Sequence, residues 1–585
     1  MKLESVPAQR ENGQQGALPD SRGLNLYAAD SGYKALLALY LPPDLHAHLQ
    51  PHLERLGALA GSELDALAHT ADFNPPVLHH RTRAGDDRQW IDKHPAYRRL
   101  EEVAFSEYGL AAMSHRPGVL GWPQKMPPAA KYALSYLYVQ AEFGVCCPLS
   151  MTDSLARSLA KFGDPSLVER FLPALNSQDM DALMQGAMFM TEQAAGSDVG
   201  ATETRAVPDG DRWRLTGDKW FCSNADAALA MVLARPDGAP RGTKGLSLFL
   251  LPKTLEDGSP NAYRIVRLKD KLGTRDMASG EIRLEGALAW LVGEPNRGFA
   301  QMTDMINNSR LSNGMRAAGM MRRALTEALF VARRRIAFGK PLIELPLMRR
   351  QLMKLMLPAE AARSFMFYTA AELAQADAGD DTARRRVRLL TPLIKFRACR
   401  DARRATGDAM EVRGGLGYIE EWSDARLVRD AHLGSIWEGT SNIVALDAMR
   451  AIRREDALGA LRPALEAMLP QGALGAALGV SFTKACDFAA QVSKDNDAVP
   501  ARQAASGLYY AVAAVVLAHE GTRLAAQGDA RRLLLAALAD EHRLRPRDPL
   551  RVEDAAREAA ITDLLLPETP VAAAAAEKLH AAGTR

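Results

Sequence analysis

The chain has 585 residues, of which 47% are hydrophobic and 24% are charged, and its formal net charge is +3. This length is too great for one hydrophobic core and predicts three or four domains, while the small net charge does not by itself argue for nucleic-acid binding. No apolar run approaches the roughly 18 residues that a membrane helix needs, and the first 20 residues lack the apolar stretch of a secretory signal. We therefore expect a soluble, cytoplasmic protein without a membrane segment.

The first 185 residues are mostly helical in pattern. Residues 1 to about 25 are rich in Gln, Gly and Pro, which predicts a disordered or wrapping arm. Leucines recur at helical spacing between Tyr33 and Leu67, and helical spacing returns over residues 129–141 and 155–175. A loop is expected around residues 82–92.

Two groups of residues, the cysteines and a set of histidines, could in principle form disulfides or bind a metal. The five cysteines show no CxxC spacing, so we expect reduced, mostly buried thiols. His46, His48 and His52 lack a nearby Cys or acidic ligand, so they predict ordinary surface histidines and no metal site.

Residues 186–295 change to the alternating pattern of strands. Leu246, Leu248 and Leu250 alternate with other residues, and turn dipeptides such as Asp209-Gly210 and Asp237-Gly238 separate the runs. This pattern predicts a compact β domain of about a hundred residues between helical parts.

Helical spacing returns at Met302 and continues to the end of the chain. One helix carries Arg388, Lys395 and Arg403 on the face opposite its apolar residues. That face is interpreted either as a solvated or subunit-facing surface, or as an anion-binding surface for nucleic acid. The region after Arg454 is rich in Ala and Leu, with nearly balanced charges.

The predicted fold class is therefore α+β, mainly α. We expect an N-terminal helical domain with an extension over residues 1–185, a central β domain over 186–295, a C-terminal four-helix-type domain over 296–453, and an extra helical region over 454–585.

Three segments carry residues suited to chemistry. Glu438 lies in the Gly-containing turn SIWEGTSNI between two apolar helical segments, where a carboxylate is either a helix cap or a base. The segment MTEQAAGSD, residues 190–198, offers a small-residue turn whose backbone N–H groups could approach a phosphate. The segment RIAFGKP begins with Arg335, whose planar fork suits a pyrophosphate, although it could equally complement a helix dipole.

Together these segments and the α, β, α order resemble the acyl-CoA dehydrogenase flavoproteins over about residues 100 to 452. MTEQAAGSD is similar to the family's flavin segment, RIAFGKP to its RxxFG segment, and GGLGYIEE…RLVRDAHLGSIWEGTSNI to its GG…RD…EGTS segment. The motifs GDKWFCSN, PLIELPLMRR and SIWEGTSNI look closest to the AidB-like branch, which is associated with the bacterial response to DNA alkylation.

The resemblance implies FAD as cofactor and an acyl-CoA as substrate. Glu438 matches the base that removes the α-proton of an acyl thioester while a β-hydride passes to flavin N5. The positions that match FAD contacts are Met190, Thr191, Gly196, Ser197, Phe221, Ser223, Arg335, Phe338, Gly415, Thr440 and Asn442. The positions that match the substrate side are Ser197, Arg310 and Gly439.

This sequence departs from the family pattern at some positions. Phe221 stands where Trp is common, and Ser309 stands where some members carry the base on an earlier helix, which leaves Glu438 as the candidate base. The resemblance also implies a homotetramer of dimers that share FAD sites, and an electron acceptor such as electron-transfer flavoprotein. The alternative hypothesis is an AidB-like DNA-binding alkylation-response flavoprotein with weak dehydrogenase activity.

Overall fold

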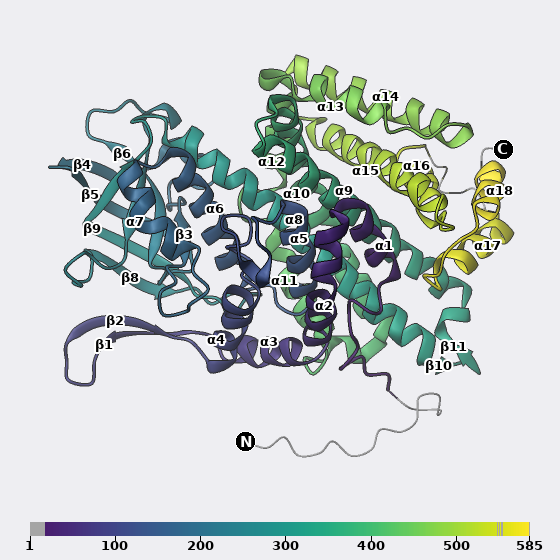
Figure 1. Cartoon of the computed structure of the whole chain (residues 1–585), viewed down its shortest axis with the longest axis horizontal. Helices are drawn as coiled ribbons and strands as arrows, with labels where there is room; N and C mark the ends of the chain where they lie inside the picture. Colours follow the sequence, from purple (N-terminus) through teal and green to yellow (C-terminus); the bar gives the residue numbers. More distant parts are fainter. Residues whose placement is uncertain (1–17, 547, 549, 551–553, 584–585) are drawn as a thin grey trace.

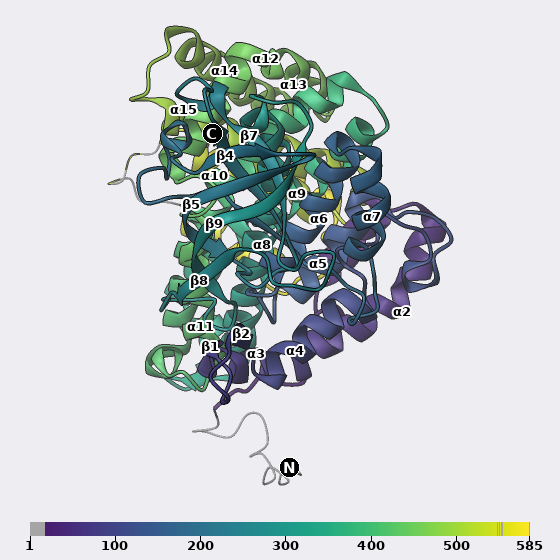
Figure 2. The same cartoon turned by 90° about the vertical axis from the view of Figure 1, so that its left-hand side faces the viewer.

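The computed structural model describes residues 18–546, 548, 550 and 554–583. The strands of the central β domain lie at one end of the molecule and the long helices fill the rest (Figure 1). Seen from that end, the β domain stands in front of the long helices α8–α10 (Figure 2). The fold class is the predicted one, mainly helical with a central β domain.

The N-terminal part is helical, as its spacing predicts. Its helices are α1 (Ser31–Tyr40), α2 (Pro43–Ala60), α3 (Glu63–Phe73), α4 (Pro95–Glu101), α5 (Pro128–Tyr138), α6 (Cys146–Phe162) and α7 (Pro165–Leu175). The leucines of α2 that recur at helical spacing, Leu45, Leu49, Leu53 and Leu56, are all buried in the main core.

The loop expected over residues 82–92 is wrong in its second half. Strands β1 (Val77–Arg81) and β2 (Asp87–Asp92) pair as an antiparallel hairpin. The side chain of Gln89 joins this hairpin to the β domain, because its amide donates to the Ile265 carbonyl and accepts from the Ile265 N–H, each at 2.9 Å. Both faces of the hairpin are largely exposed, so the sequence lacks the apolar alternation that marks a strand.

The β domain forms a sheet that closes on itself. Its strands are β3 (Gly186–Phe189), β4 (Arg205–Asp209), β5 (Arg212–Ser223), β6 (Leu229–Pro236), β7 (Ser247–Pro252), β8 (Tyr263–Leu268) and β9 (Ser279–Val292). Strand β6 pairs with β4 and with β7, and β5 and β9 complete the ring, while β3 and β8 add to its margins. Gly210 and Gly238 have φ of +65° and +81°, so the predicted turn dipeptides do form turns.

The C-terminal domain is built on long helices. They are α8 (Gly298–Arg334), α9 (Pro346–Asp377) and α10 (Asp381–Arg413), followed by α11 (Ser423–Gly434) and α12 (Ser441–Glu455). A short hairpin of β10 (Ile336–Ala337) and β11 (Lys340–Pro341) joins α8 to α9.

The extra region continues as helices α13 (Ala457–Glu466), α14 (Ala473–Asp495), α15 (Ala501–Ala525), α16 (Arg531–Arg543), α17 (Ala555–Leu565) and α18 (Ala573–Gly583). The apolar run of α15 is buried in the main core rather than exposed. Among the described residues, no helix is both long and apolar enough to cross a membrane.

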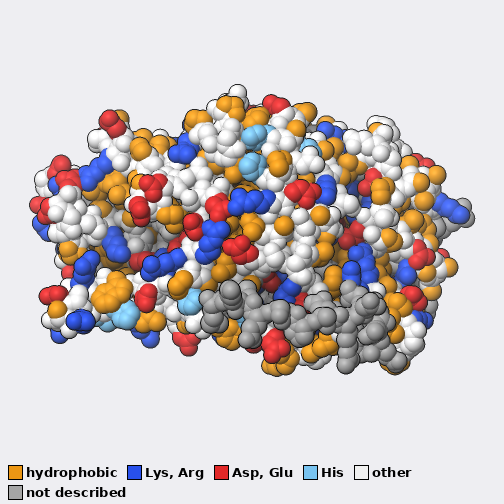
Figure 3. Space-filling model, turned by 60° about the horizontal axis from the view of Figure 1, so that its bottom comes forward, with side chains coloured by type: hydrophobic (Ala, Val, Ile, Leu, Met, Phe, Trp, Pro, Cys, Tyr) orange, Lys and Arg blue, Asp and Glu red, His pale blue; other side chains and the backbone are white. Residues whose placement is uncertain are grey.

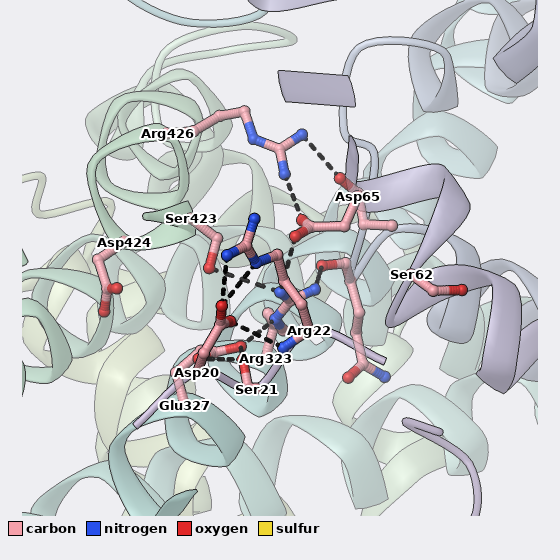
Figure 4. Close-up of polar contacts among 12 residues, drawn as sticks. Asp20, Ser21, Arg22, Ser62, Asp65, Arg323, Glu327, Ser423, Asp424 and Arg426 are labelled. Atoms are coloured by element: carbon pink, nitrogen blue, oxygen red, sulfur yellow. Dashed lines mark hydrogen bonds and ion pairs between the residues drawn. The ribbon is translucent and has the colours of Figure 1, made fainter. Parts of the chain in front are cut away.

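A buried ionic cluster fixes the start of the described chain to three helices (Figure 4). Arg323 of α8 pairs with Glu327 at 2.8 Å and with Asp65 of α3 at 3.2 Å, and Arg426 of α11 pairs with Asp65 at 2.6 Å. Ser21 donates to the Glu327 carboxylate at 2.7 Å. The segment from residue 18 therefore wraps onto the helices, which agrees with the expectation of a wrapping arm rather than a disordered one. Residues 1–17 of the predicted arm lie outside the described residues.

Candidate active site

Glu438 lies on a tight turn between α11 and α12. Its φ is +54°, and the φ of Gly439 is +97°, so two successive residues occupy the left-handed region. A side chain is rarely held there without support from its surroundings. A Cβ at Gly439 would also lie 3.1 Å from Val444, so glycine suits the position on both counts.

Two neutral side chains of α8 hold the Glu438 carboxylate. Ser309 donates its hydroxyl to Oε1 and Asn313 donates its amide to Oε2. The two residues are four positions apart and so share one face of the helix. Ser309 is fully buried, and its hydroxyl also lies 3.4 Å from that of Ser150 on α6. The carboxylate is thus oriented by donors that water does not reach.

An aromatic pair shields the turn. The rings of Trp437 and Phe143 stack with centroids 5.8 Å apart and an interplanar angle of 20°. The guanidinium of Arg316 packs against both rings, 4.8 Å from the Trp437 centroid and 5.5 Å from that of Phe143. Arg316 lies three positions after Asn313, on the same side of α8.

Lys395 and Arg388 of α10 lie behind the turn, which corrects their interpretation as a basic surface, whereas Arg403 is exposed as that interpretation expects. Lys395 is buried and donates to the carbonyl of Gly439. Burial lowers the pKa of Lys395 to about 8. Arg388 pairs with Asp447 at 2.8 Å and with Glu455 at 3.0 Å. The sequence pattern placed these cations opposite an apolar face, but α12 and the base turn cover that side as well.

Arg310, expected on the substrate side, lies beside the base. Its Nε is 3.4 Å from the Glu438 carbonyl oxygen, and its NH1 binds the Asp447 carboxylate. Asp447 thereby joins Arg310 to Arg388 of α10. Burial alone would raise the pKa of Asp447, but Arg310 and Arg388 lower it to about 2.

The structure brings Met190 and Thr191 to the strand that carries Phe221 and Ser223. Met190 and Thr191 follow β3, and the carbonyl of Thr191 accepts from the backbone of Trp220 on β5 at 2.8 Å. The next ring, Phe221, has an exposed fraction of 58%, although it is large and apolar. The turn at Gly196 and Ser197 is open, because a Cβ at Gly196 would meet nothing within 4 Å.

Cys147 of α6 connects this edge of the β domain to the base. Burial raises the pKa of the Cys147 thiol to about 11. The charge of Arg316 lowers this pKa and that of Glu438 raises it. The Ser223 hydroxyl of β5 also lowers this pKa, so groups of the β domain, of α8 and of the base turn all act on this thiol.

A second group of predicted residues lies elsewhere. Arg335 donates to the carbonyl of Arg413 at 2.6 Å, next to the turn that contains Gly415. Phe338 is in the β10–β11 hairpin with 91% of its surface exposed. This hairpin is at the end of the molecule opposite the β domain (Figure 1). The chain therefore does not bring Arg335, Phe338 and Gly415 to Phe221.

The last two predicted cofactor contacts begin α12. Thr440 is its N-cap residue and makes no side-chain capping bond, and the Asn442 side-chain oxygen accepts from Arg502 of α15 at 3.3 Å. The extra helical region thus reaches the residues that follow the base.

Sequence reasoning missed how α8 contributes to the site. It used Ser309 only as the position where a base is absent, and it did not single out Asn313 or Arg316. The signal is the spacing of these three polar residues at i, i+4 and i+7, which places them on one side of α8.

Comparison with known proteins identifies the family. Residues 17–182 match the model of the adaptive response protein AidB N-terminal domain, 187–287 that of the acyl-CoA dehydrogenase middle domain, and 296–453 that of the acyl-CoA dehydrogenase C-terminal domain. The chain is 32% identical over 457 residues to acyl-CoA dehydrogenase family member 11 of Caenorhabditis elegans, covering 76% of this chain and 73% of that protein. It is 34% identical over 416 residues to the putative acyl-CoA dehydrogenase AidB of Escherichia coli K12, and the match covers 69% of this chain and 73% of that protein.

Solved structures agree. The apo form of Bd2924 is 32% identical with a TM-score of 0.78 and covers 86% of this chain and 99% of its own. Caenorhabditis elegans ACDH-11 in complex with C11-CoA is 26% identical with a TM-score of 0.82, and the match covers 94% of this chain and 96% of that chain. The chain belongs to the acyl-CoA dehydrogenase family and is an oxidoreductase. Its N-terminal domain further marks it as AidB-like, as the sequence motifs indicated.

Proposed function

We propose that the protein is an FAD-dependent dehydrogenase of an acyl-CoA thioester, with Glu438 as the base that removes the α-proton. The observation that carries this proposal is the Glu438 carboxylate, held on a left-handed turn by Ser309 and Asn313. A base on a fixed turn, beside a stacked aromatic pair that limits water, is suited to take a proton from carbon.

The residues present fit the cofactor that the family implies. Phe221 offers an exposed aromatic face, Ser223 lies two positions further along the same strand, and the backbone of Thr191 is bonded to the neighbouring Trp220. The open turn at Gly196 and Ser197 leaves its backbone free for a diphosphate. FAD, when bound there, would supply the acceptor for the hydride that leaves the β-carbon.

The separate position of Arg335, Phe338 and Gly415 supports the proposal that these residues complete the FAD site of a neighbouring copy. A tetramer of dimers with shared sites would also cover the exposed Phe338. We propose electron-transfer flavoprotein or a similar carrier as electron acceptor, the cytoplasm as location, and the four domains 1–185, 186–295, 296–453 and 454–585 as folding units.

The hypothesis of DNA binding has less support. Lys395 is buried and Arg388 is paired with carboxylates, so of the three cations of the predicted face Arg403 alone is exposed to a phosphate. On the face drawn in Figure 3, Lys and Arg side chains alternate with Asp and Glu rather than forming a basic patch. Retardation of DNA in a gel-shift titration at low salt would revive this alternative.

The dehydrogenase proposal is tested by anaerobic addition of acyl-CoAs of different chain types to the flavin-loaded protein. We expect the flavin absorbance of the wild type to bleach with a suitable acyl-CoA. Glu438→Gln keeps the shape of the side chain but removes the base, so it should bind FAD and not bleach. Glu294→Gln, an exposed residue whose partner is Arg297 at 3.1 Å, is the matched control. Equal bleaching by Glu438→Gln and wild type would remove Glu438 from this role.

A further inference from the structure

Arg316 is a buried cation with incomplete hydrogen bonding. It is 0% exposed, and its Nε donates to the Ser312 carbonyl at 3.3 Å. Neither NH1 nor NH2 has a hydrogen-bond partner within the part of the chain that the structure describes. A buried charge is normally paired, because it has lost its hydration without compensation. The free edge of this guanidinium therefore requires an acceptor that the chain itself does not provide.

The position of Arg316 relates this unmet requirement to the base. Arg316 packs 4.8 Å from the ring centroid of Trp437, the residue before Glu438, and it follows Asn313 on the same side of α8. Trp437 Nε1 is likewise buried without a partner in the described chain. The aromatic rings stabilise the charge through cation–π contact but cannot accept its in-plane N–H groups. Unused donors thus gather beside the base, which favours an acceptor-rich, anionic ligand group.

We propose that Arg316 determines substrate specificity by binding a carboxylate on the acyl chain, so that the substrate class is an acyl thioester that ends in a carboxylate. This inference rests on the proposed dehydrogenase function. A guanidinium binds a carboxylate through two parallel hydrogen bonds, which neutralises both charges.

The position of Arg316 restricts the ligand further. Arg316 belongs to the helix that holds the base, whereas the residues that fit the flavin ring are on the β domain. The acyl group between them is therefore the partner that Arg316 meets.

The test compares two thioesters that differ only at the end of the acyl chain. Glutaryl-CoA and pentanoyl-CoA each have a five-carbon acyl group, and binding of both to the flavin-loaded protein is measured by calorimetry. We expect the wild type to prefer glutaryl-CoA by roughly 30-fold or more, as expected for a buried charge pair. In Arg316→Met this ratio should fall close to one, and Arg316→Lys should recover part of it. Arg462→Met, at an exposed arginine paired with Glu466 at 2.9 Å, should retain the wild-type ratio.

Three outcomes separate the hypotheses. A wild type without preference for glutaryl-CoA, or an Arg316→Met ratio equal to that of the wild type, overturns the inference. So does loss of FAD from folded Arg316→Met, read from the flavin-to-protein absorbance ratio, because the cofactor would then be the partner. Arg316-dependent binding of glutaryl-CoA without bleaching by any acyl-CoA would refute only the dehydrogenase proposal, since calorimetry requires no turnover.

Discussion

Ser309→Ala provides the sharpest test of how the base is positioned. The substitution removes the hydroxyl that donates to Glu438 Oε1 and leaves the donation from Asn313 to Oε2 in place. Ser309 is fully buried, so water does not readily replace its hydroxyl. A hydrogen bond to a charged group contributes about 1.5–3 kcal/mol. If this energy orients the carboxylate for the transition state, the rate of flavin reduction should fall roughly 10- to 100-fold.

The assay is anaerobic stopped-flow reduction of the flavin over a range of acyl-CoA concentrations, which separates the limiting rate from the dissociation constant. We expect the limiting rate to fall while the dissociation constant stays within about threefold, because Ser309 acts on the base. Ser158→Ala is the control, since Ser158 is buried in α6 and its hydroxyl has no partner among residues 18–546. A limiting rate within twofold of the wild type would show that Asn313 and the turn alone orient Glu438.

Two carboxylates beside the site give predictions for stability. Burial raises the pKa of Asp430 to about 7, although the Thr274 N–H, bonded at 2.7 Å, lowers it. Its neutral form therefore stabilises the fold in acid, and this contribution is lost as the pH rises through 7. The free energy of unfolding of the wild type, measured in urea, should fall between pH 5.5 and 8. In Asp430→Asn this fall should be smaller by about 2 kcal/mol, and an equal fall in both proteins would contradict the assignment. Burial would raise the pKa of Asp447, but Arg310 and Arg388 lower it to about 2. The Asp447 carboxylate therefore stabilises the fold above pH 4, and this contribution is lost as the pH falls toward 2. Asp447→Asn should cost about 2–3 kcal/mol at pH 7 in the same measurement and less at pH 3.5, and equal losses at both would refute the assignment.

Patterns that depend on neighbours along the chain could be predicted from the sequence. The helical spacing of α2 and the turn at Gly210 reflect local rules of side-chain burial and backbone freedom, and both appear in the structure. The β2 strand was missed because Gln89 finds its partner, Ile265, 176 positions away. The sequence predicts Lys395 on a surface, because nothing in its own helix reveals that the base turn covers it.

The same limit applies to the base itself. The motif EGTS predicts a carboxylate on a Gly turn, but the donors that orient it, Ser309 and Asn313, lie 129 and 125 positions earlier in the chain. Such contacts are encoded by the packing of α8 against the turn, which no local pattern reports. Only a family resemblance could therefore distinguish Glu438 from a helix cap.

The division of the predicted cofactor residues has a consequence for assembly. Phe221 stands on the β domain, whereas Phe338 is on the hairpin at the opposite end of the molecule, and both rings are exposed. One FAD cannot contact both within a single chain, yet an exposed aromatic ring on a folded protein calls for a covering surface. Under the proposal of a shared FAD site, placing Phe338 of one copy against the cofactor of another would cover both rings at once. Cofactor retention and subunit association would then be coupled, since each would supply the surface that the other lacks.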